Sequence, residues 1–187
     1  MPVGVMELDL GPFNNRPEEW KLYCPLVGNT MLELGNKRNG LYTYKNFFQR
    51  LGYQHISVDW NGEDGAMKLD LRQPLQLGVF DMVSNIGTTE HISEQEPVWR
   101  NILEAMHVGS VLVSTTPAPG HWPRHGSFYP MAKFFLQLAS RNGLVLERLY
   151  KYEEIGPQHH MWYARLRRET AMQFTMPDNE TIYRNAA

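Results

Sequence analysis

The sequence predicts an α/β fold: a doubly wound, mostly parallel sheet of about seven strands with an antiparallel edge strand. Two observations carry this prediction. Short apolar runs alternate with amphipathic stretches along most of the chain, which is the order of strands and crossover helices in a parallel sheet. The run at residues 30–34 contains an acid near its end, Glu33, and is followed by Gly35. A polar loop then extends to Gly40. A turn of this kind, at the carboxyl end of the first strand, is where a nucleoside-like cofactor binds in open α/β sheets.

The first half of the chain contains four apolar runs of strand length. We expect strands at residues 30–34, 56–59, 66–71 and 79–85. The apolar stripe of an amphipathic helix follows the first strand, at Tyr44, Phe47, Phe48 and Leu51. Gly52 stands where a helix C-terminal glycine is expected. Residues 17–27 carry the signals of a short helix, because a proline at the start is followed by two acids.

The second half continues the alternation. Helices are expected at residues 98–106, closed by His107 and Gly109, and at residues 131–139. Strands are expected at residues 110–114, 144–150 and 160–166. Because no helix separates the last two strands, they are predicted to form an antiparallel pair at one edge. A loop rich in Pro, Gly and His occupies residues 115–129.

The size and charge of the chain limit its organisation and its partners. A length of 187 residues favours a single domain, 1–187, with an N-terminal arm and helix at 1–29, a core at 30–168 and a peripheral tail at 169–187. The formal net charge of -2 gives no broad attraction to nucleic acid. The basic cluster at residues 165–168 is interpreted as a solvated strand end. The sequence leaves the oligomeric state open.

The cysteine content and hydropathy predict a cytoplasmic protein. Cys24 is the one cysteine, so a disulfide within the chain and a cysteine-based zinc site are excluded, and we interpret it as a small packed residue. No apolar run has the length of a membrane span, and the N-terminus lacks the layout of a signal peptide. We therefore expect no membrane partner.

The order of the motifs resembles the class I S-adenosylmethionine (SAM)-dependent methyltransferases, a family with a Rossmann-like fold. The resemblance extends over residues 30–168 and rests on an ordered set of short segments: Glu33-Leu34-Gly35, Asp59, Asp70-Leu71, Phe80–Asn85, Glu90-His91-Ile92, Asn101–Met106 and Gly109–Val113. The family usually has two further glycines in the first turn, where this chain has Lys37 and Asn39. Since glycine lets the backbone approach a ligand closely, this departure bears on the geometry of the turn and on cofactor affinity.

The resemblance implies SAM as the cofactor. It assigns these residues to the cofactor site: Glu33, Gly35, Lys37, Asp59, Trp60, Asp70, Leu71, Asn85, Ile86 and Gly87. Asp59 would accept hydrogen bonds from both ribose hydroxyls, and Asp70 would take the amino group of adenine. Glu33 would contact the methionine ammonium or bond to loop amides, and Trp60 would stack near adenine or pack under its loop. Residues 85–88 would line the side of methyl transfer.

Three histidines lie in loops expected at the carboxyl edge of the sheet. Any of His91, His121 and His125 could act as a catalytic base near neutral pH, although His91 could instead serve only to fix its loop. Together with Glu90 these histidines are potential ligands of a divalent ion. Their spacing matches no metal motif, so we expect no metal.

The stiff loop around Trp122 is interpreted as a lid over the methyl acceptor. Trp122 would form a wall of the acceptor pocket, and Arg124 would contact an anionic group. The alternative is an ordered surface loop held by its prolines.

These features favour a stand-alone SAM-dependent methyltransferase that acts on a small or medium-sized oxygen or nitrogen acceptor. We expect no added domain that could bind a macromolecule. The alternative is a catalytically inactive SAM- or S-adenosylhomocysteine (SAH)-binding scaffold that acts through a protein partner. A nicotinamide-dependent oxidoreductase would need the motif G-x-G-x-x-G after the first strand, and residues 35–40 have only the first and last of these glycines.

Overall fold

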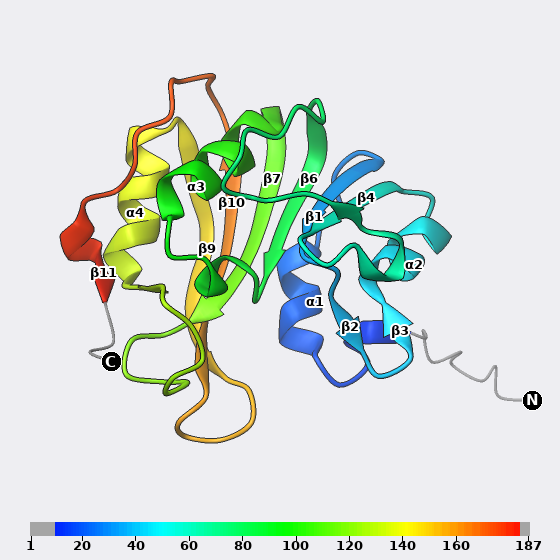
Figure 1. Ribbon diagram of the computed structural model, residues 1–187, viewed down its shortest axis with the longest axis horizontal. Coiled ribbons are helices and arrows are strands. Elements are labelled where there is room, and N and C mark those ends of the chain that lie inside the picture. Colours follow the sequence, from blue (N-terminus) through cyan, green and yellow to red (C-terminus); the bar gives the residue numbers. More distant parts are fainter. Residues whose placement is uncertain (1–9, 184–187) are drawn as a thin grey trace, which may run out of the picture.

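The computed structural model describes residues 10–183 and is built around one large sheet (Figure 1). The strands of this sheet are β1 (Thr30–Leu34), β4 (Gln54–Asp59), β5 (Met67–Lys68), β6 (Phe80–Ile86), β7 (Met106–Pro117), β9 (Leu144–Glu153) and β10 (His160–Arg168). Their order is β5-β4-β1-β6-β7-β10-β9. Neighbours from β5 to β7 pair in parallel, whereas β10 is antiparallel to both β7 and β9. The predicted seven-stranded, mostly parallel sheet is confirmed, and its reversed strand lies second from the edge.

Helices and two small sheets complete the described part of the chain. The helices are α1 (Pro17–Tyr23), α2 (Tyr44–Arg50), α3 (Gln95–Glu104) and α4 (Ala132–Arg141). The small sheets pair β2 (Arg38–Asn39) with β3 (Tyr42–Thr43), and β8 (Tyr129–Pro130) with β11 (Ile182–Tyr183). Within residues 10–183, none of the helices combines the length and the apolar character needed to cross a bilayer.

The sheet separates two hydrophobic cores because successive strand residues point to opposite faces. Leu32 and Val83 belong to a core formed with α3 and α4, which we call the α3/α4 face. Met31 and Met82 point the other way, into a core formed with α1, α2 and the 3-10 turn Gly11–Phe13, which we call the α1/α2 face. The doubly wound arrangement is therefore as predicted, and the loops after the parallel strands are free to build a site.

The helix predicted to end at residue 106 is shorter than expected. It stops at Glu104, and Met106 begins β7, where it pairs with Phe80 of β6. Met106 continues the apolar stripe of the helix, but an apolar residue looks the same in a sequence whether it belongs to a helix or to a strand. Here its pairing with β6 places it in the strand. His107 and Gly109, predicted to close the helix, lie within the strand.

Other predicted boundaries also differ. The helix expected at residues 17–27 ends at Tyr23. The strand expected at residues 66–71 is reduced to β5, because only the last two residues of β4, Val58 and Asp59, pair with it. The loop expected at residues 115–129 starts later, because β7 continues to Pro117, which pairs with Met161 of β10. The loop itself occupies residues 118–128.

Both ends of the described chain pack against the core, contrary to prediction. Phe13, placed in a loop or arm, is fully buried with its ring centroid 4.7 Å from that of Tyr44. In the tail, predicted to be peripheral, Thr181 is fully buried and β11 pairs with β8. The remainder of the predicted arm and tail, residues 1–9 and 184–187, lies outside the described chain.

The basic cluster at residues 165–168 is not a solvated strand end. The guanidinium of Arg165 is buried, and it donates to the carbonyl oxygens of Leu22 and Tyr23 at the end of α1 and of Pro25 just beyond it. Its Nε also donates to Glu147 at 2.8 Å. These carbonyls have no intrahelical partner, so Arg165 fastens the end of α1 to the sheet.

Candidate functional site

A cleft of about 740 Å³ opens at the carboxyl ends of β4 and β6. Its walls come from the end of β4, from the segment after β5 and from the turn after β6. Residues predicted to bind the cofactor gather in its lining: Asp59, Trp60, Asp70, Leu71 and Gly87. The fold therefore brings together predicted site residues that are distant in the sequence.

The two aspartates of this cleft have different surroundings. Asp59 Oδ1 accepts a hydrogen bond from Asn61 N–H at 2.9 Å, and within residues 10–183 no donor reaches Oδ2. Asp70 is held by the guanidinium of Arg72, at 3.0 Å from Nε and 2.8 Å from Nη2, and these hydrogen bonds lower the pKa of Asp70. An adenine amino group would have to compete with Arg72. Trp60 is 78% exposed, so it does not pack under its loop.

The first turn, after β1, avoids the need for the family's extra glycines. Gly35 has a φ of +83°, and a Cβ on it would lie 2.4 Å from Thr88 Oγ1, so a side chain is excluded there. The polar loop that follows forms the hairpin of β2 and β3, which turns at Gly40 with a φ of +59°. Lys37 and Asn39 keep a negative φ. They therefore add no backbone strain to the turn.

Glu33 supports this turn from the α1/α2 face. Its Oε1 accepts from Lys37 N–H at 2.8 Å, which is the structural role considered for Glu33 as an alternative to ligand contact. Its Oε2 lies 3.3 Å from His55 Nε2, and neither atom makes a hydrogen bond in the described part of the chain. Burial raises the pKa of Glu33 to about 8 and lowers the pKa of His55 to about 4, so both are uncharged at pH 7. His55 was not predicted as part of this group, because in the sequence it resembles any other strand residue.

The residues at the end of β6 and just after it divide between support and lining. Asn85 is fully buried, and its Nδ2 donates to Thr89 Oγ1 at 3.0 Å and to Ser114 Oγ at 2.9 Å. Ile86 packs in the core of the α1/α2 face. Gly87 lines the cleft. The side chains of Asn85 and Ile86, predicted to line the methyl-transfer side, thus lie beneath it.

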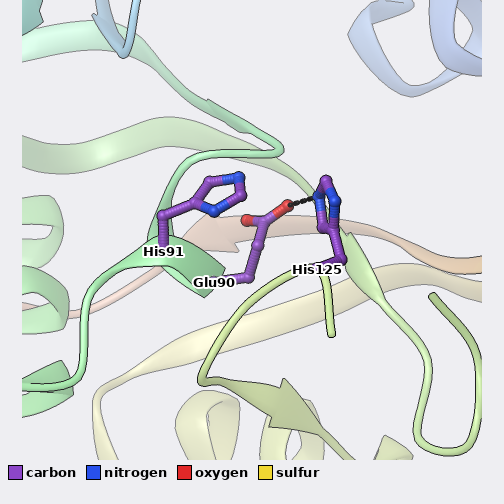
Figure 2. A group of neighbouring side chains, drawn as sticks. All are labelled: Glu90, His91 and His125. Carbon is purple, nitrogen blue, oxygen red and sulfur yellow. Dashed lines mark ion pairs between the residues drawn. The ribbon is translucent and has the colours of Figure 1, made fainter. Parts of the chain in front are cut away.

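His91 and His125 meet at the carboxylate of Glu90 (Figure 2). Figure 2 shows this carboxylate between the two rings, whose centroids are 4.8 Å apart. His125 Nε2 lies 3.8 Å from Glu90 Oε1. His121 is not part of this group, because its Nε2 lies 3.1 Å from Nδ1 of His160. Burial, followed by the charge of His160, lowers the pKa of His121. The predicted convergence of three histidines is therefore reduced to a pair.

Backbone hydrogen bonds fasten loop 118–128 to the turn that carries Glu90. The N–H groups of Ser127 and Phe128 donate to the carbonyl oxygen of Glu90 at 2.7 and 3.2 Å. A Cβ on Gly126 would lie 2.5 Å from the same oxygen, so glycine is required for this approach. The loop and the turn after β6 therefore form one unit.

The loop also holds two strained residues on either side of Pro123. Trp122 and Arg124 have φ values of +53° and +59°, a conformation that costs on the order of 1 kcal/mol or more for each non-glycine residue. The carbonyl of Trp122 accepts from the hydroxyl of Tyr129 at 2.7 Å, and its ring packs 5.0 Å from that of His125. Such strain persists only where the surroundings enforce it, so the loop holds His125 in a fixed position.

The chain resembles known proteins in its fold and not in its sequence. No family model matches the chain, and no curated protein sequence matches it. Solved structures do match. One is 1,6-didemethyltoxoflavin-N1-methyltransferase from Burkholderia thailandensis, with bound 1,6-didemethyltoxoflavin and SAH. It superposes with a TM-score of 0.64 at 11% identity, over 83% of this chain and 78% of that chain.

Two further structures share the same architecture. A SAM-dependent methyltransferase from Mesorhizobium loti gives a TM-score of 0.64 at 14% identity, over 86% of this chain and 99% of that chain. N-methyltransferase NodS from Bradyrhizobium japonicum WM9, in complex with SAH, gives 0.59 at 14%, over 87% and 91%. The chain has the fold of the SAM-dependent methyltransferases. In this methyltransferase fold, the cleft of Asp59 and Gly87 lies at the carboxyl ends of parallel strands, where open α/β sheets bind ligands.

Proposed function

We propose that the chain is a SAM-dependent methyltransferase that transfers a methyl group to an oxygen or nitrogen of a small or medium-sized acceptor. The observation that carries this proposal is the cleft in which Asp59, Asp70 and Gly87 meet on a methyltransferase fold. Its volume of about 740 Å³ lies within the range of about 300–1,000 Å³ typical of small-ligand pockets. The neighbours that hold SAH support the same cofactor for this chain.

The residues of the cleft fit an adenosine group. Asp59 offers Oδ2 as a hydrogen-bond acceptor for a ribose hydroxyl. Leu71 and the exposed ring of Trp60 offer apolar surface to a base. Gly35 and Gly87, with φ values of +83° and +65°, let the backbone of two turns pass close to a ligand.

The chain's part in catalysis is to bind and orient. SAM, when bound, supplies an electrophilic methyl group, and the group that departs from this methyl is neutral. Asp59 would fix the ribose, while Trp122 and Arg124 of loop 118–128 would enclose and position the acceptor. His91, His121 and His125 are the candidates to take a proton from an acceptor that must lose one. His91 and His125 are the two that share the carboxylate of Glu90.

The cofactor assignment is tested by calorimetry with SAH. Asp59→Ala is expected to weaken SAH binding at least about 10-fold, because a charge-assisted hydrogen bond to a carboxylate contributes about 1.5–3 kcal/mol. The matched control is Glu63→Ala, an exposed acid further along the same loop whose carboxylate makes no hydrogen bond within residues 10–183. Equal affinity of the two variants would contradict the role of Asp59, and no binding by the native chain would overturn the proposal.

Turnover separates an enzyme from a scaffold. We expect the native chain to transfer a labelled methyl group from SAM to members of a panel of small phenols and amines. SAH binding without transfer to any small acceptor would favour the catalytically inactive scaffold. Transfer to a protein or nucleic acid alone would contradict the small-molecule partner that we expect.

A further inference from the structure

We propose that Glu90, His91 and His125 form a binding site for one divalent transition-metal ion, beside the cofactor cleft. One ligand atom from each of these residues lies within 4.8 Å of the others, and the three side chains converge from two loops (Figure 2). Metal–ligand bonds of about 2.0–2.2 Å set ligand atoms about 3–3.5 Å apart. The separation of 3.8 Å between His125 Nε2 and Glu90 Oε1 needs only a small contraction to reach that range.

The carboxylate of Glu90 lacks the partners that a buried acid requires. Glu90 is fully buried, and within residues 10–183 neither of its carboxylate oxygens makes a hydrogen bond. A buried carboxylate without partners is strongly destabilising, so such groups are paired or coordinate metals. The nearest ion-pair partner is His125, which is charged only when protonated. A cation between the carboxylate and the two imidazoles would satisfy all three groups at once.

Lys37 is the other positive group near this carboxylate. A Cβ placed on Gly87 would lie 3.3 Å from Glu90 Oε1 and 3.5 Å from Lys37 Nζ, so both atoms approach the same point. The ammonium and the carboxylate are not within ion-pair distance of each other. Lys37 therefore forms no ion pair with Glu90. The positive charge of Lys37 repels a metal ion bound at Glu90 and does not take its place.

The backbone around the three ligands is built to hold them. The carbonyl of Glu90 receives two N–H groups from loop 118–128, and His125 N–H donates to the carbonyl of Trp122 at 3.1 Å. His91 and Glu90 belong to one 3-10 helix, Thr89–His91, and Asn85 Oδ1 accepts from the N–H of its first residue, Thr89, at 3.0 Å. Hydrogen bonds therefore hold the backbone of both loops that carry the ligands.

The ligand set indicates the class of metal and the use of the site. Two imidazoles and one carboxylate suit Zn²⁺, Mn²⁺ or Fe²⁺ better than Mg²⁺ or Ca²⁺, which prefer oxygen ligands. Three protein ligands leave a coordination position open. His91 also lines the cofactor cleft, so on the proposed function this position would bind an oxygen or nitrogen of the acceptor.

Calorimetric titration of the full chain with Zn²⁺, after chelator treatment and without SAM, tests the site. We expect one Zn²⁺ per chain, and at least an approximately 100-fold loss of affinity in Glu90→Gln and in His125→Ala, more than removal of a supporting group around a metal typically costs. His107→Ala is the control, since His107 pairs with Asp81 and lies outside the proposed machinery. This control should bind Zn²⁺ as the native chain does. Lys37→Met should bind it more tightly.

Two results would overturn the metal site: no Zn²⁺ binding by the native chain, or equal affinity in Glu90→Gln, His125→Ala and His107→Ala. SAH binding by the same chelator-treated variants shows that they are folded. It also separates the two proposals. SAH binding without Zn²⁺ binding removes the metal site alone, whereas Zn²⁺ binding without SAH binding removes the methyltransferase function alone.

Discussion

The two faces of the sheet bury their polar groups in different ways. On the α3/α4 face, the buried indole of Trp99 and the buried amide of Asn101 are paired. Trp99 Nε1 donates to Gln95 Oε1 at 2.8 Å, and Asn101 Nδ2 donates to the carbonyl of Leu71 at 2.8 Å. Each polar atom in these pairs has exchanged water for a protein partner, as in an ordinary core. This face can be expected to contribute a stability that does not vary with pH.

The α1/α2 face also buries groups that titrate. Glu33 of β1 lies in register between Ser57 of β4 and Ser84 of β6. Glu33 Oε2 and Ser57 Oγ are buried without a hydrogen-bond partner in the described chain. Burial also raises the pKa of the nearby Glu19. This face, which supports the first turn, therefore buries ionisable groups at the expense of stability, which is typical of regions shaped by function.

The largest expected effect belongs to the apolar face. Phe134 of α4 is fully buried, with its ring 5.1 Å from that of Trp99 and 5.3 Å from that of Phe128. Phe134→Ala should lower the free energy of unfolding in urea by about 3–5 kcal/mol, because it leaves a cavity. The loss should be equal at pH 6.5 and pH 8. Leu136→Ala on the exposed side of the same helix is the control, and a pH-dependent loss at Phe134 would break the comparison.

A smaller, pH-dependent effect is expected at Glu33. Its pKa rises from 4.5 to about 8 on folding, so its stabilising contribution is complete below pH 4.5 and is lost as the pH rises toward 8. The pKa of His55 falls from 6.5 to about 4, so its contribution is present above pH 6.5 and is lost as the pH falls toward 4. The two trends cancel between pH 4.5 and 6.5. Between pH 6.5 and 8 the native chain should lose about 1 kcal/mol per pH unit through Glu33.

Glu33→Gln should remove that loss, because the amide oxygen can still accept from Lys37 N–H and no proton is needed. Urea unfolding at several pH values between 6.5 and 8 measures the difference between the variant and the native chain. This difference isolates Glu33, because the raised pKa of Glu19 adds a slope of the same sign to both. Glu104→Gln, an exposed acid on α3, is the control. Parallel pH profiles for Glu33→Gln and the native chain would show that Glu33 is charged in the fold.

The smallest effect compares two buried serines of the sheet. Ser57 Oγ has no hydrogen-bond partner within residues 10–183, whereas Ser114 Oγ accepts from Asn85 Nδ2 at 2.9 Å. Ser57→Ala should raise the free energy of unfolding by about 0.5–1 kcal/mol, since it removes an unsatisfied buried hydroxyl, and Ser114→Ala should lower it by about 1–2 kcal/mol. Thermal unfolding followed by circular dichroism measures both. Equal destabilisation by the two changes would mean that Ser57 has a bonded partner in solution.

The elements that the sequence predicted well are those with a strong local period. The stripe that contains Phe134 and Leu138 gives α4, and the run at residues 30–34 gives β1 with the same limits. The assignment of Met106 to a helix was wrong because an apolar residue suits a helix and a strand equally. Pairing with β6 determines that it belongs to the strand. Arg165 was misinterpreted because the carbonyls that it binds are more than a hundred residues away. No local pattern encodes such a contact.

The site was predictable as a set of strand ends and less so as a set of contacts. Asp59, Asp70 and Gly87 gather in one cleft because parallel strands end on one side, which strand order alone implies. The choice of His125 over His121 as the partner of His91 depends on Gly126 reaching the carbonyl of Glu90. That approach is a property of the folded loop, so spacing in the sequence gave no metal motif.

The unequal outer strands of the sheet bear on self-association. β9 leaves one side of its backbone unpaired, and charged exposed side chains occur along it: Glu147, Arg148, Lys151 and Glu153. A second copy adding its own strand there would have to bring these charges together and remove them from water. β5, at the other margin, offers a length of only two residues as a template. Growth of the sheet into fibrils is therefore opposed at both edges, at β9 by its charged side chains and at β5 by the short length of the strand.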